Sequence, residues 1–257
     1  MKITWNGTAS VMLEAAGEKL LIDPFVELKG GTNPNTLEDY LDFDTILITH
    51  GHFDHLYFVP ELLDETGATV LCTKTPAQTL ERYSDKADTV AQIGPGMAFS
   101  LGVFEIHTYQ GRHIHFGPAM AASALAPMNL LRRPASLPFL AWANHAFQEN
   151  GETLVYEIVT EGKHLLVMGS LGLATDVDYP QGADLLLLPY QGSLHPEKEA
   201  LQVIERLLPR KVMLTHFDDA FPPISKDVDT RPLCRMMKER FPDIAVVKPK
   251  AGKAIRL

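Results

Sequence analysis

The sequence is poor in cysteine, with only Cys72 and Cys234 in 257 residues. Two cysteines are too few for the disulfide framework that stabilises small secreted domains, and neither has a partner at the spacing of a metal-binding pair. We therefore expect a protein that works in a reduced compartment, with a cytoplasmic location.

Long apolar runs and positive charge are also scarce. Residues 1–6 lack the apolar core of a signal peptide, and no uninterrupted apolar stretch approaches the length that crosses a bilayer. Lys and Arg number 23 against 32 Asp and Glu, and the net charge of −9 attracts neither nucleic acid nor an anionic membrane surface. We expect a small-molecule substrate, no nucleic acid and no integral membrane contact, and we leave a homo-oligomer open.

The chain does contain apolar residues in short alternating blocks. At 46% hydrophobic residues it can bury one large core, so we expect a single domain over residues 1–257. Strand-like runs alternate with helical periodicity, which is typical of an α/β or α+β fold. The expected strands are residues 2–5, 10–15, 19–23, 45–49, 68–72, 89–93, 97–107, 153–160, 164–169, 184–188, 212–215, 244–248 and 253–257. The expected helices are residues 57–65, a helix from Pro76, one from Pro196 with an apolar face that includes Leu208, and residues 230–240.

The most informative segment reads Thr-His-Gly-His-Phe-Asp-His, at residues 49–55, directly after the apolar run 45–48. Neutral imidazoles and a carboxylate suit a divalent ion such as zinc where no thiolates are offered. A strand that ends at this segment would place its ligands beyond the carboxyl end of a strand, where α/β folds build sites. The alternative, a polar loop of ordinary histidines, is disfavoured by the density of potential ligands: His50, His52, Asp54 and His55.

The pattern His50-x-His52-x-Asp54-His55 resembles the H-x-H-x-D-H signature of the metallo-β-lactamase superfamily of metal-dependent hydrolases. Residues 3–10 and 20–25 are similar to its branch of ascorbate-6-phosphate lactonase-like and N-acylphosphatidylethanolamine phospholipase D-like proteins. The resemblance implies an αβ/βα sandwich, two mixed β-sheets flanked by helices. It also implies one or two divalent ions, zinc first, with Mn2+ or Fe2+ as alternatives. It does not name a substrate, because this fold hosts many reactions.

The remaining ligands must come from later histidines. His216 ends the apolar run 212–215 as His50 ends its own, and it matches the C-terminal ligand of the family; the alternative is a solvated loop histidine. His113 follows residues 105–112, which resemble the strand-then-histidine element of the family, with His115 and then His107 as competitors. The resemblance thus implies one ion on His50, His52 and His113 and a second on Asp54, His55 and His216. The histidines expected to be structural or substrate-facing are His145, His164 and His195.

The family pattern breaks at Ser170. Relatives usually have a strand that ends in Gly-Asp, whose carboxylate bridges two ions, whereas this chain has Gly169-Ser170. Two dications repel each other, and a neutral hydroxyl in the bridging position offsets almost none of that repulsion. We expect one ion bound firmly and a second loosely, although Asp54 and a bridging hydroxide still allow a binuclear centre. Asp176 is a disfavoured substitute, because six residues of loop separate it from Ser170.

The implied activity is hydrolysis of an ester, lactone, amide or phosphodiester of a small, phosphorylated or lipid-like substrate through a metal-bound hydroxide. Asp54 would be the catalytic carboxylate, as ligand and orienter of the hydroxide, or as general base if the second metal is absent. One alternative is a non-catalytic metal- or ligand-binding protein of the same fold, because Ser170 alters the bridge. A nuclease-type phosphodiesterase is disfavoured by the acidic charge and by the lack of room for a clamping domain.

Residues 116–150 read as an apolar insertion near the mouth of the site. Their only formal charges are Arg132, Arg133 and Glu149, and four prolines divide the segment. One hypothesis is a lid that binds an apolar group while Arg132 and Arg133 hold a phosphate or carboxylate. The alternative is a dimerisation surface or plain core packing. The loop 29–36 is expected to flank the same cleft.

Overall fold

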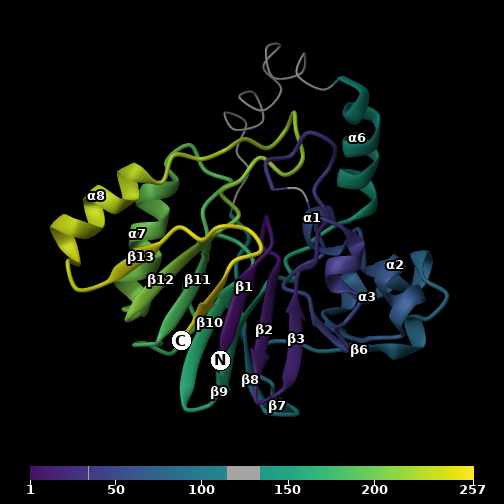
Figure 1. Cartoon of the computed structure of the whole chain (residues 1–257), viewed down its shortest axis with the longest axis horizontal. Coiled ribbons are helices and arrows are strands. Elements are labelled where there is room, and N and C mark those ends of the chain that lie inside the picture. Colours follow the sequence, from purple (N-terminus) through teal and green to yellow (C-terminus); the bar gives the residue numbers. More distant parts are fainter. Residues whose placement is uncertain (34, 115–133) are drawn as a thin grey trace.

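The computed structural model describes residues 1–33, 35–114 and 134–257. They form two β-sheets packed face to face, with helices on the outer faces (Figure 1). This is the αβ/βα sandwich that the sequence predicted, with two mixed sheets flanked by helices.

The first sheet has the strand order β14-β1-β2-β3-β4-β5-β6. Its strands are β1 (Lys2–Trp5), β2 (Val11–Ala15), β3 (Glu18–Ile22), β4 (Thr45–Leu47), β5 (Thr69–Cys72), β6 (Val90–Gln92) and β14 (Ala254–Arg256). β1, β2 and β3 form an antiparallel meander, whereas β3 to β6 run parallel. The carboxyl ends of β3 and β4 therefore meet at one edge of the sheet.

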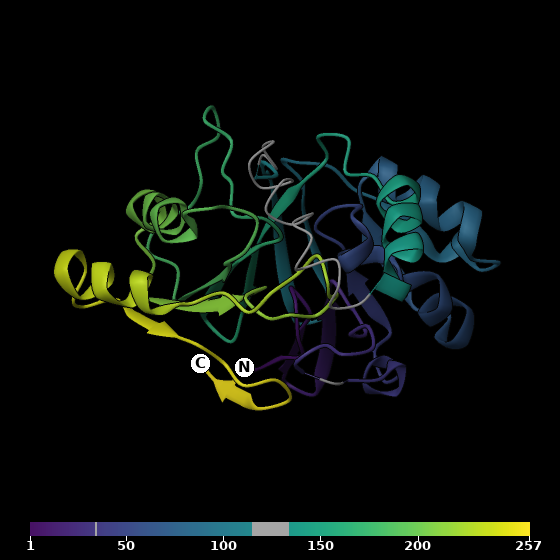
Figure 2. The same ribbon diagram turned by 90° about the horizontal axis from the view of Figure 1, so that it is seen from above.

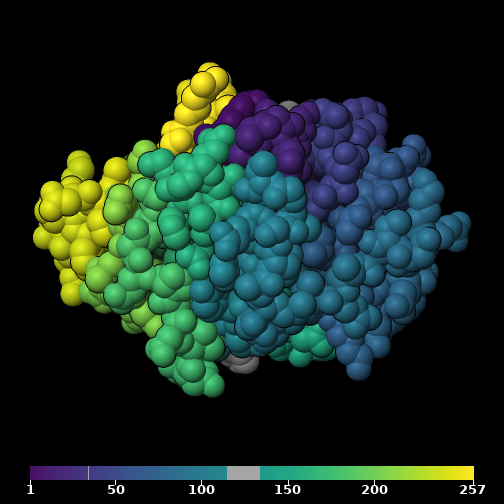
Figure 3. Space-filling model, turned by 90° about the horizontal axis from the view of Figure 1, so that it is seen from below, coloured from purple at the N-terminus to yellow at the C-terminus, as the bar shows by residue number. Residues whose placement is uncertain are grey.

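The second sheet has the order β13-β12-β11-β10-β9-β8-β7. Its strands are β7 (Ala98–Leu101), β8 (Phe104–Gln110), β9 (Leu154–Thr160), β10 (Lys163–Met168), β11 (Leu185–Pro189), β12 (Lys211–Thr215) and β13 (Ala245–Val247). β10 to β13 run parallel, so β10 and β12 also end on one side. β1 pairs with β14, which places the N-terminal and C-terminal segments side by side (Figure 3).

Helices cover both outer faces, as the view from above shows (Figure 2). The α-helices are α1 (Phe53–Leu56), α2 (Val59–Thr66), α3 (Lys74–Tyr83), α6 (Leu137–Ala146), α7 (Pro196–Leu207) and α8 (Arg231–Arg240). Short 3-10 turns are η1 (Leu37–Tyr40), η2 (Ala87–Thr89) and η3 (Pro134–Ser136). Among the residues that the structure describes, no helix is both long and apolar enough to cross a membrane.

The alternation of side chains along β3 explains why its last three residues, 20–22, are all apolar. Leu20 and Ile22 point into the core between the two sheets, while Leu21 packs on the outer face with α2 and α3. Successive strand residues face opposite sides, so a strand covered on both faces must be apolar at every position. The same buried cluster extends to Ile204 of α7 and Leu233 of α8, the helices that cover the second sheet.

Two local predictions need correction, and one segment contains a helix that the sequence did not predict. The strand expected at 97–107 is a hairpin, β7 and β8, because Gly102 turns the chain with φ 53°. Leu208, expected on the buried face of α7, is 45% exposed, because it ends the helix in a left-handed conformation. The described part of the insertion 116–150 contains the ten-residue helix α6. Pro138 lies in its first turn, where a backbone N–H would have no acceptor within the helix, so the missing N–H of proline costs nothing.

Candidate metal centre

Four strand ends carry the polar residues of the site. Asp23 follows β3 directly and His216 follows β12 directly, while His50 and Ser170 lie shortly after β4 and β10. β3 and β4 belong to one sheet, and β10 and β12 belong to the other. The site therefore sits across the top of the sandwich in Figure 1, near α1.

The first ligand group contains His50, His52 and His113, one ring nitrogen from each lying within 4.8 Å of the others. His52 Nδ1 is 3.1 Å from His113 Nε2. The Nδ1 of His113 is 2.8 Å from the carbonyl oxygen of Ile114, to which it donates, so its Nε2 is left with a free lone pair. The Nε2 of His50 is buried with no hydrogen-bond partner among the described residues. The group is made of nitrogen donors alone.

The second ligand group contains Asp54, His55 and His216, again with donor atoms within 4.8 Å of one another. Asp54 Oδ2 is 2.8 Å from His216 Nε2 and 3.7 Å from His55 Nε2. The ring centroids of His50 and His55 are 4.0 Å apart, so the two groups adjoin. α1 supplies Asp54 and His55, because the chain turns into a helix immediately after His52.

Asp23 and Thr49 hold a ring from each group. The buried carboxylate of Asp23 accepts the Thr49 backbone N–H at 2.8 Å, the Thr49 hydroxyl at 2.6 Å and the Nδ1–H of His55 at 2.8 Å. The Thr49 oxygen is in turn 3.1 Å from Nδ1 of His50. Each ring is thereby turned so that its Nε2 faces the site, which is how outer carboxylates orient histidine ligands. A Cβ on Gly169 would lie 1.9 Å from the Thr49 oxygen, so only glycine leaves room for this contact.

The backbone is strained where the strands end. Thr8, Asp23 and His216 are non-glycine residues with φ of 43°, 45° and 50°. The N–H of His216 donates to the carbonyl of Thr8 at 2.6 Å, which ties two of these strained residues together. Left-handed conformations of such residues cost free energy and persist where the surroundings enforce them, often at functional sites.

The two groups differ in their pKa shifts. Burial, reinforced by the neighbouring rings, lowers the pKa of His50 and lowers that of His52 to about 4. Burial also lowers the pKa of His113, although the hydrogen bond to Ile114 opposes it. Burial also acts on His55, but Asp23 and Asp54 outweigh it and raise the pKa of that ring. Burial alone would raise the pKa of Asp54, yet His55 and His216 hold it well below its usual range. The first group is neutral at neutral pH, and the second contains an ionised carboxylate.

Both groups fit a divalent ion. Three donor atoms converge in each, and the buried, unpartnered Nε2 of His50 is the kind of atom that a metal ion would satisfy. The structure brings all six residues named from the sequence into these two groups of three.

The other sequence candidates lie elsewhere or have other partners. His107 is 3.7 Å from Glu105 and outside both groups, which removes it as a competitor of His113. His164 and His195 pair with neighbouring glutamates. Asp176 is exposed and belongs to neither group. His115, Arg132 and Arg133 lie outside the described residues.

The sequence predicted that Ser170 stands where the family pattern has a bridging aspartate. Its side chain is buried and its oxygen accepts the backbone N–H of Ile114 at 3.0 Å. Ser170 lines the same cavity as both ligand groups. The hydroxyl therefore helps to hold the segment that carries His113.

A cavity of about 580 Å³ opens over the two groups. Residues that follow strands of both sheets contribute to its wall, and so does the described part of the insertion, through Asn144 and Glu149. The sequence did not point to Asp23 or Thr49 as supporting residues. One signal for Asp23 was available in the sequence. It is a polar residue directly after the apolar run 20–22, just as His50 is a polar residue shortly after its own strand.

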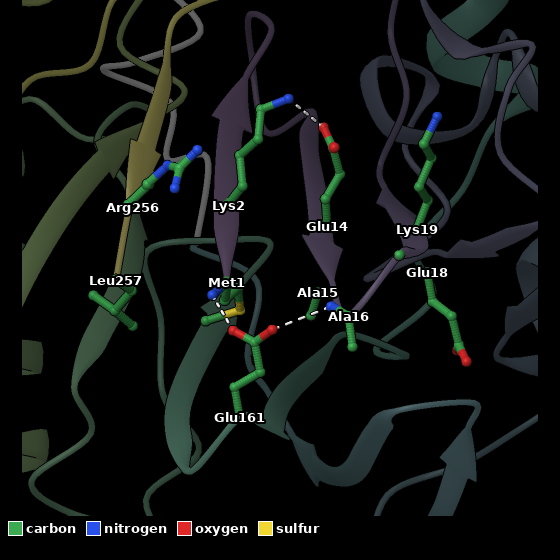
Figure 4. Close-up of a pocket in the computed structure, with 11 residues that line it drawn as sticks. Met1, Lys2, Glu14, Ala15, Ala16, Glu18, Lys19, Glu161, Arg256 and Leu257 are labelled. Atoms are coloured by element: carbon green, nitrogen blue, oxygen red, sulfur yellow. Dashed lines mark hydrogen bonds and ion pairs between the residues drawn. The ribbon is translucent and has the colours of Figure 1, made fainter.

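A second hollow, of about 390 Å³, lies at the opposite end of the sandwich (Figure 4). It adjoins the β2–β3 turn, at the other end of β3 from Asp23. Its acidic groups are largely paired, since Glu161 binds the N-terminal amine and the Ala16 N–H, and Glu14 binds Lys2. No histidine lines it. Both groups of possible metal ligands therefore lie at the other end of the sandwich.

The mixed-sheet sandwich with two histidine-containing ligand groups at its strand ends defines a protein of the metallo-β-lactamase fold. The model of the β-lactamase superfamily domain matches residues 18–217. A UPF0173 metal-dependent hydrolase of Ligilactobacillus salivarius is 30% identical over 234 residues, 89% of this chain and 90% of the relative.

Two solved structures share the fold. A metallo hydrolase from Ignicoccus hospitalis has a TM-score of 0.69 at 20% identity, covering 99% of this chain and 97% of that one. A diiron β-hydroxylase from Streptomyces venezuelae has a TM-score of 0.61 at 14% identity, covering 100% of this chain and 54% of that one.

The chain belongs to the β-lactamase superfamily, within the family of the UPF0173 metal-dependent hydrolases. The sequence-based prediction of a metal-dependent hydrolase of this superfamily is confirmed at the level of the family.

Proposed function

We propose that this protein hydrolyses an ester, lactone, amide or phosphodiester bond of a small molecule at a centre formed by the two ligand groups. The observation that carries the proposal is their arrangement, two sets of three donors with the rings of His50 and His55 4.0 Å apart, under a cavity large enough for a small substrate. We further propose that residues 1–257 act as one domain, since both sheets supply ligands.

Zinc is the ion we favour, because five of the six ligands are imidazoles and no thiolate is present. The carboxylate of Asp54 leaves manganese and iron as alternatives for the second group. A divalent ion in such a site lowers the pKa of bound water and polarises the oxygen of the bond under attack.

The protein's own residues have separable roles in this proposal. His50, His52 and His113 stay unprotonated at neutral pH, because burial lowers the pKa of each ring, and their lone pairs remain available. Asp54 stays ionised, because its neighbouring imidazoles hold its pKa well below the usual range. A carboxylate that ionises so readily is a weak proton acceptor, so we assign Asp54 to orienting water by accepting its hydrogen bond rather than to acting as general base.

A second candidate is a metal- or ligand-binding protein without turnover. Ser170 favours it, because its oxygen already accepts the Ile114 N–H and carries no charge to place between two ions. The structures of similar fold also include a hydroxylase, so the fold alone does not select hydrolysis.

The proposal is tested by metal analysis of protein purified without chelators, followed by a screen of lactone, thioester, amide and phosphodiester substrates. We expect bound divalent metal and hydrolysis of at least one class, which a chelator removes and zinc restores. Stoichiometric metal without any turnover would favour the non-catalytic candidate. Hydrolysis that survives complete metal removal would contradict both.

A further inference from the structure

The loop from Asp219 to Lys226 forms one wall of the cavity and is held firmly. The Ser225 hydroxyl donates to Asp219 at 2.7 Å and accepts the Phe221 N–H at 2.8 Å. The side-chain amide of Gln191 donates to the carbonyl of Lys226 at 2.9 Å, which joins the loop to the segment after β11. Pro222 and Pro223 restrict its backbone further. A wall built in this way keeps its shape when a ligand enters.

This wall is apolar near the ligand groups. Phe221 packs edge-to-face against Phe53, with ring centroids 5.1 Å apart, and Ile224 packs onto the same cluster. All three side chains line the cavity beside Asp54 and His216. The reacting end of a substrate therefore lies next to a surface suited to hydrocarbon rather than to polar groups.

The polar side of the cavity is unbalanced in charge. The carboxylate of Glu149 accepts the Thr153 hydroxyl at 2.5 Å and the Gly151 N–H at 2.9 Å, and Asp54 is engaged by His216. Lys226 is the only Lys or Arg among the described residues that line the cavity, and no ion pair of its ammonium group occurs within that part of the chain. An ammonium group at the edge of an apolar wall, with no ion pair to any residue that the structure describes, can bind an anion.

We propose that Lys226 selects substrates that carry a carboxylate or phosphate group at the far end of an apolar portion. The inference rests on the proposed function, because it assigns the substrate class of the same cavity. The apolar portion packs on Phe53, Phe221 and Ile224, and the anionic group pairs with Lys226. Arg132 and Arg133, the residues first expected to hold an anion, are not required for this contact.

Binding of four six-carbon probes tests the assignment: hexyl phosphate, hexanoate, hexanamide and hexyltrimethylammonium. Calorimetry on the metal-loaded and on the metal-free protein separates pairing with Lys226 from binding to the metal. The variants are Lys226→Met, which removes the charge and keeps the chain length, and Lys226→Arg, which keeps the charge. Lys198→Met, an exposed lysine of α7 outside the cavity, is the matched control.

We expect Lys226→Met to weaken one or both anionic probes about three- to tenfold, the range for a partly exposed ion pair, while hexanamide changes little. Lys226→Arg and Lys198→Met should bind all four probes as the unmodified protein does. The probe with the larger loss identifies phosphate or carboxylate as the preferred group. Equal weakening of hexanamide and the anions, or no change with either anion, overturns the assignment.

These experiments distinguish a failure of the anion site from a failure of the proposed hydrolysis. If the unmodified protein hydrolyses no substrate yet loses anion binding in Lys226→Met, hydrolysis fails and the anion site stands. If it hydrolyses neutral and anionic esters with ratios of kcat/KM that Lys226→Met leaves unchanged, the proposed function stands and the role of Lys226 is refuted.

Discussion

The two ligand groups lie side by side but differ in electrostatic character. The first, His50, His52 and His113, consists of imidazoles whose pKa values burial lowers. The second contains ionised Asp54, and the carboxylate of Asp23 lies 2.8 Å behind His55. A neutral group binds an ion by coordination alone, whereas the second adds Coulomb attraction and also competition from the proton on His55. Adjacent positions built from the same motif are therefore expected to respond differently to substitution and pH.

The largest expected effect is the loss of the first ion. Replacing His50 and His52 together by alanine removes two of its three ligands, and we expect its affinity to fall by at least about 100-fold. Metal content after dialysis measures the change. His164→Ala, at an exposed histidine that pairs with Glu157, is the control and should retain full metal. Full metal retention in the double variant would refute the assignment of the ligand groups.

The variant Asp54→Asn tests whether the second group needs its carboxylate to bind an ion. The amide keeps the size of the side chain but removes the charge, so we expect the second ion to bind about 10- to 100-fold more weakly. The first ion should stay, because Asp54 contributes none of its donors. Calorimetric titration with zinc resolves the two affinities. Equal weakening of both ions would show that the groups act as one unit.

The pH dependence of binding sharpens the comparison. His52 has its pKa lowered to about 4, so protons compete for the first group only in strongly acidic solution. The pKa of His55 is raised, so its proton must be displaced already near neutrality. As the pH falls from about 7 to about 5.5, we expect the affinity of the second ion to drop up to about tenfold per pH unit while the first is nearly constant. Titrations with zinc at the two pH values measure both affinities. A steeper fall in the affinity of the first ion than in that of the second would contradict the assigned charges.

The smallest expected effect comes from Ser170. Ser170→Asp restores the carboxylate that the family pattern has at this position and should tighten the second ion by about tenfold, because a negative charge offsets repulsion between two dications. Ser170→Asn, of similar size but neutral, is the control. Two tight ions in the unmodified protein would mean that another group supplies the bridge and would invalidate this account of Ser170.

Local sequence carried the prediction of the fold and of the central motif. Short apolar runs that end in polar residues, together with the spacing of His50, His52, Asp54 and His55, were enough to propose an α/β or α+β fold with ligands at strand ends. The resemblance to the family supplied the sandwich. Residues so close in sequence must also lie close in space. His113 lies 61 residues beyond His52 and His216 lies 162 residues beyond Asp54, the motif residues that they contact. Local spacing could not predict these contacts, and the resemblance to a family was needed to propose both residues as ligands.

Tertiary structure decided everything that depends on distant strands meeting. The contact of Asp23 with Thr49 and His55 exists because β3 and β4 run parallel and end together, and no local pattern states which strands will be neighbours. The opposite charge character of the two groups arises in the same way, since burial and nearby carboxylates set each pKa. Nothing in the sequence distinguishes Lys226 from other lysines. It lines the cavity because Gln191 joins its loop to the segment after β11, while Ser225 ties the loop together through Asp219 and Phe221. Local spacing determines which chemical groups are available, and strand pairing across the sandwich determines what surrounds them.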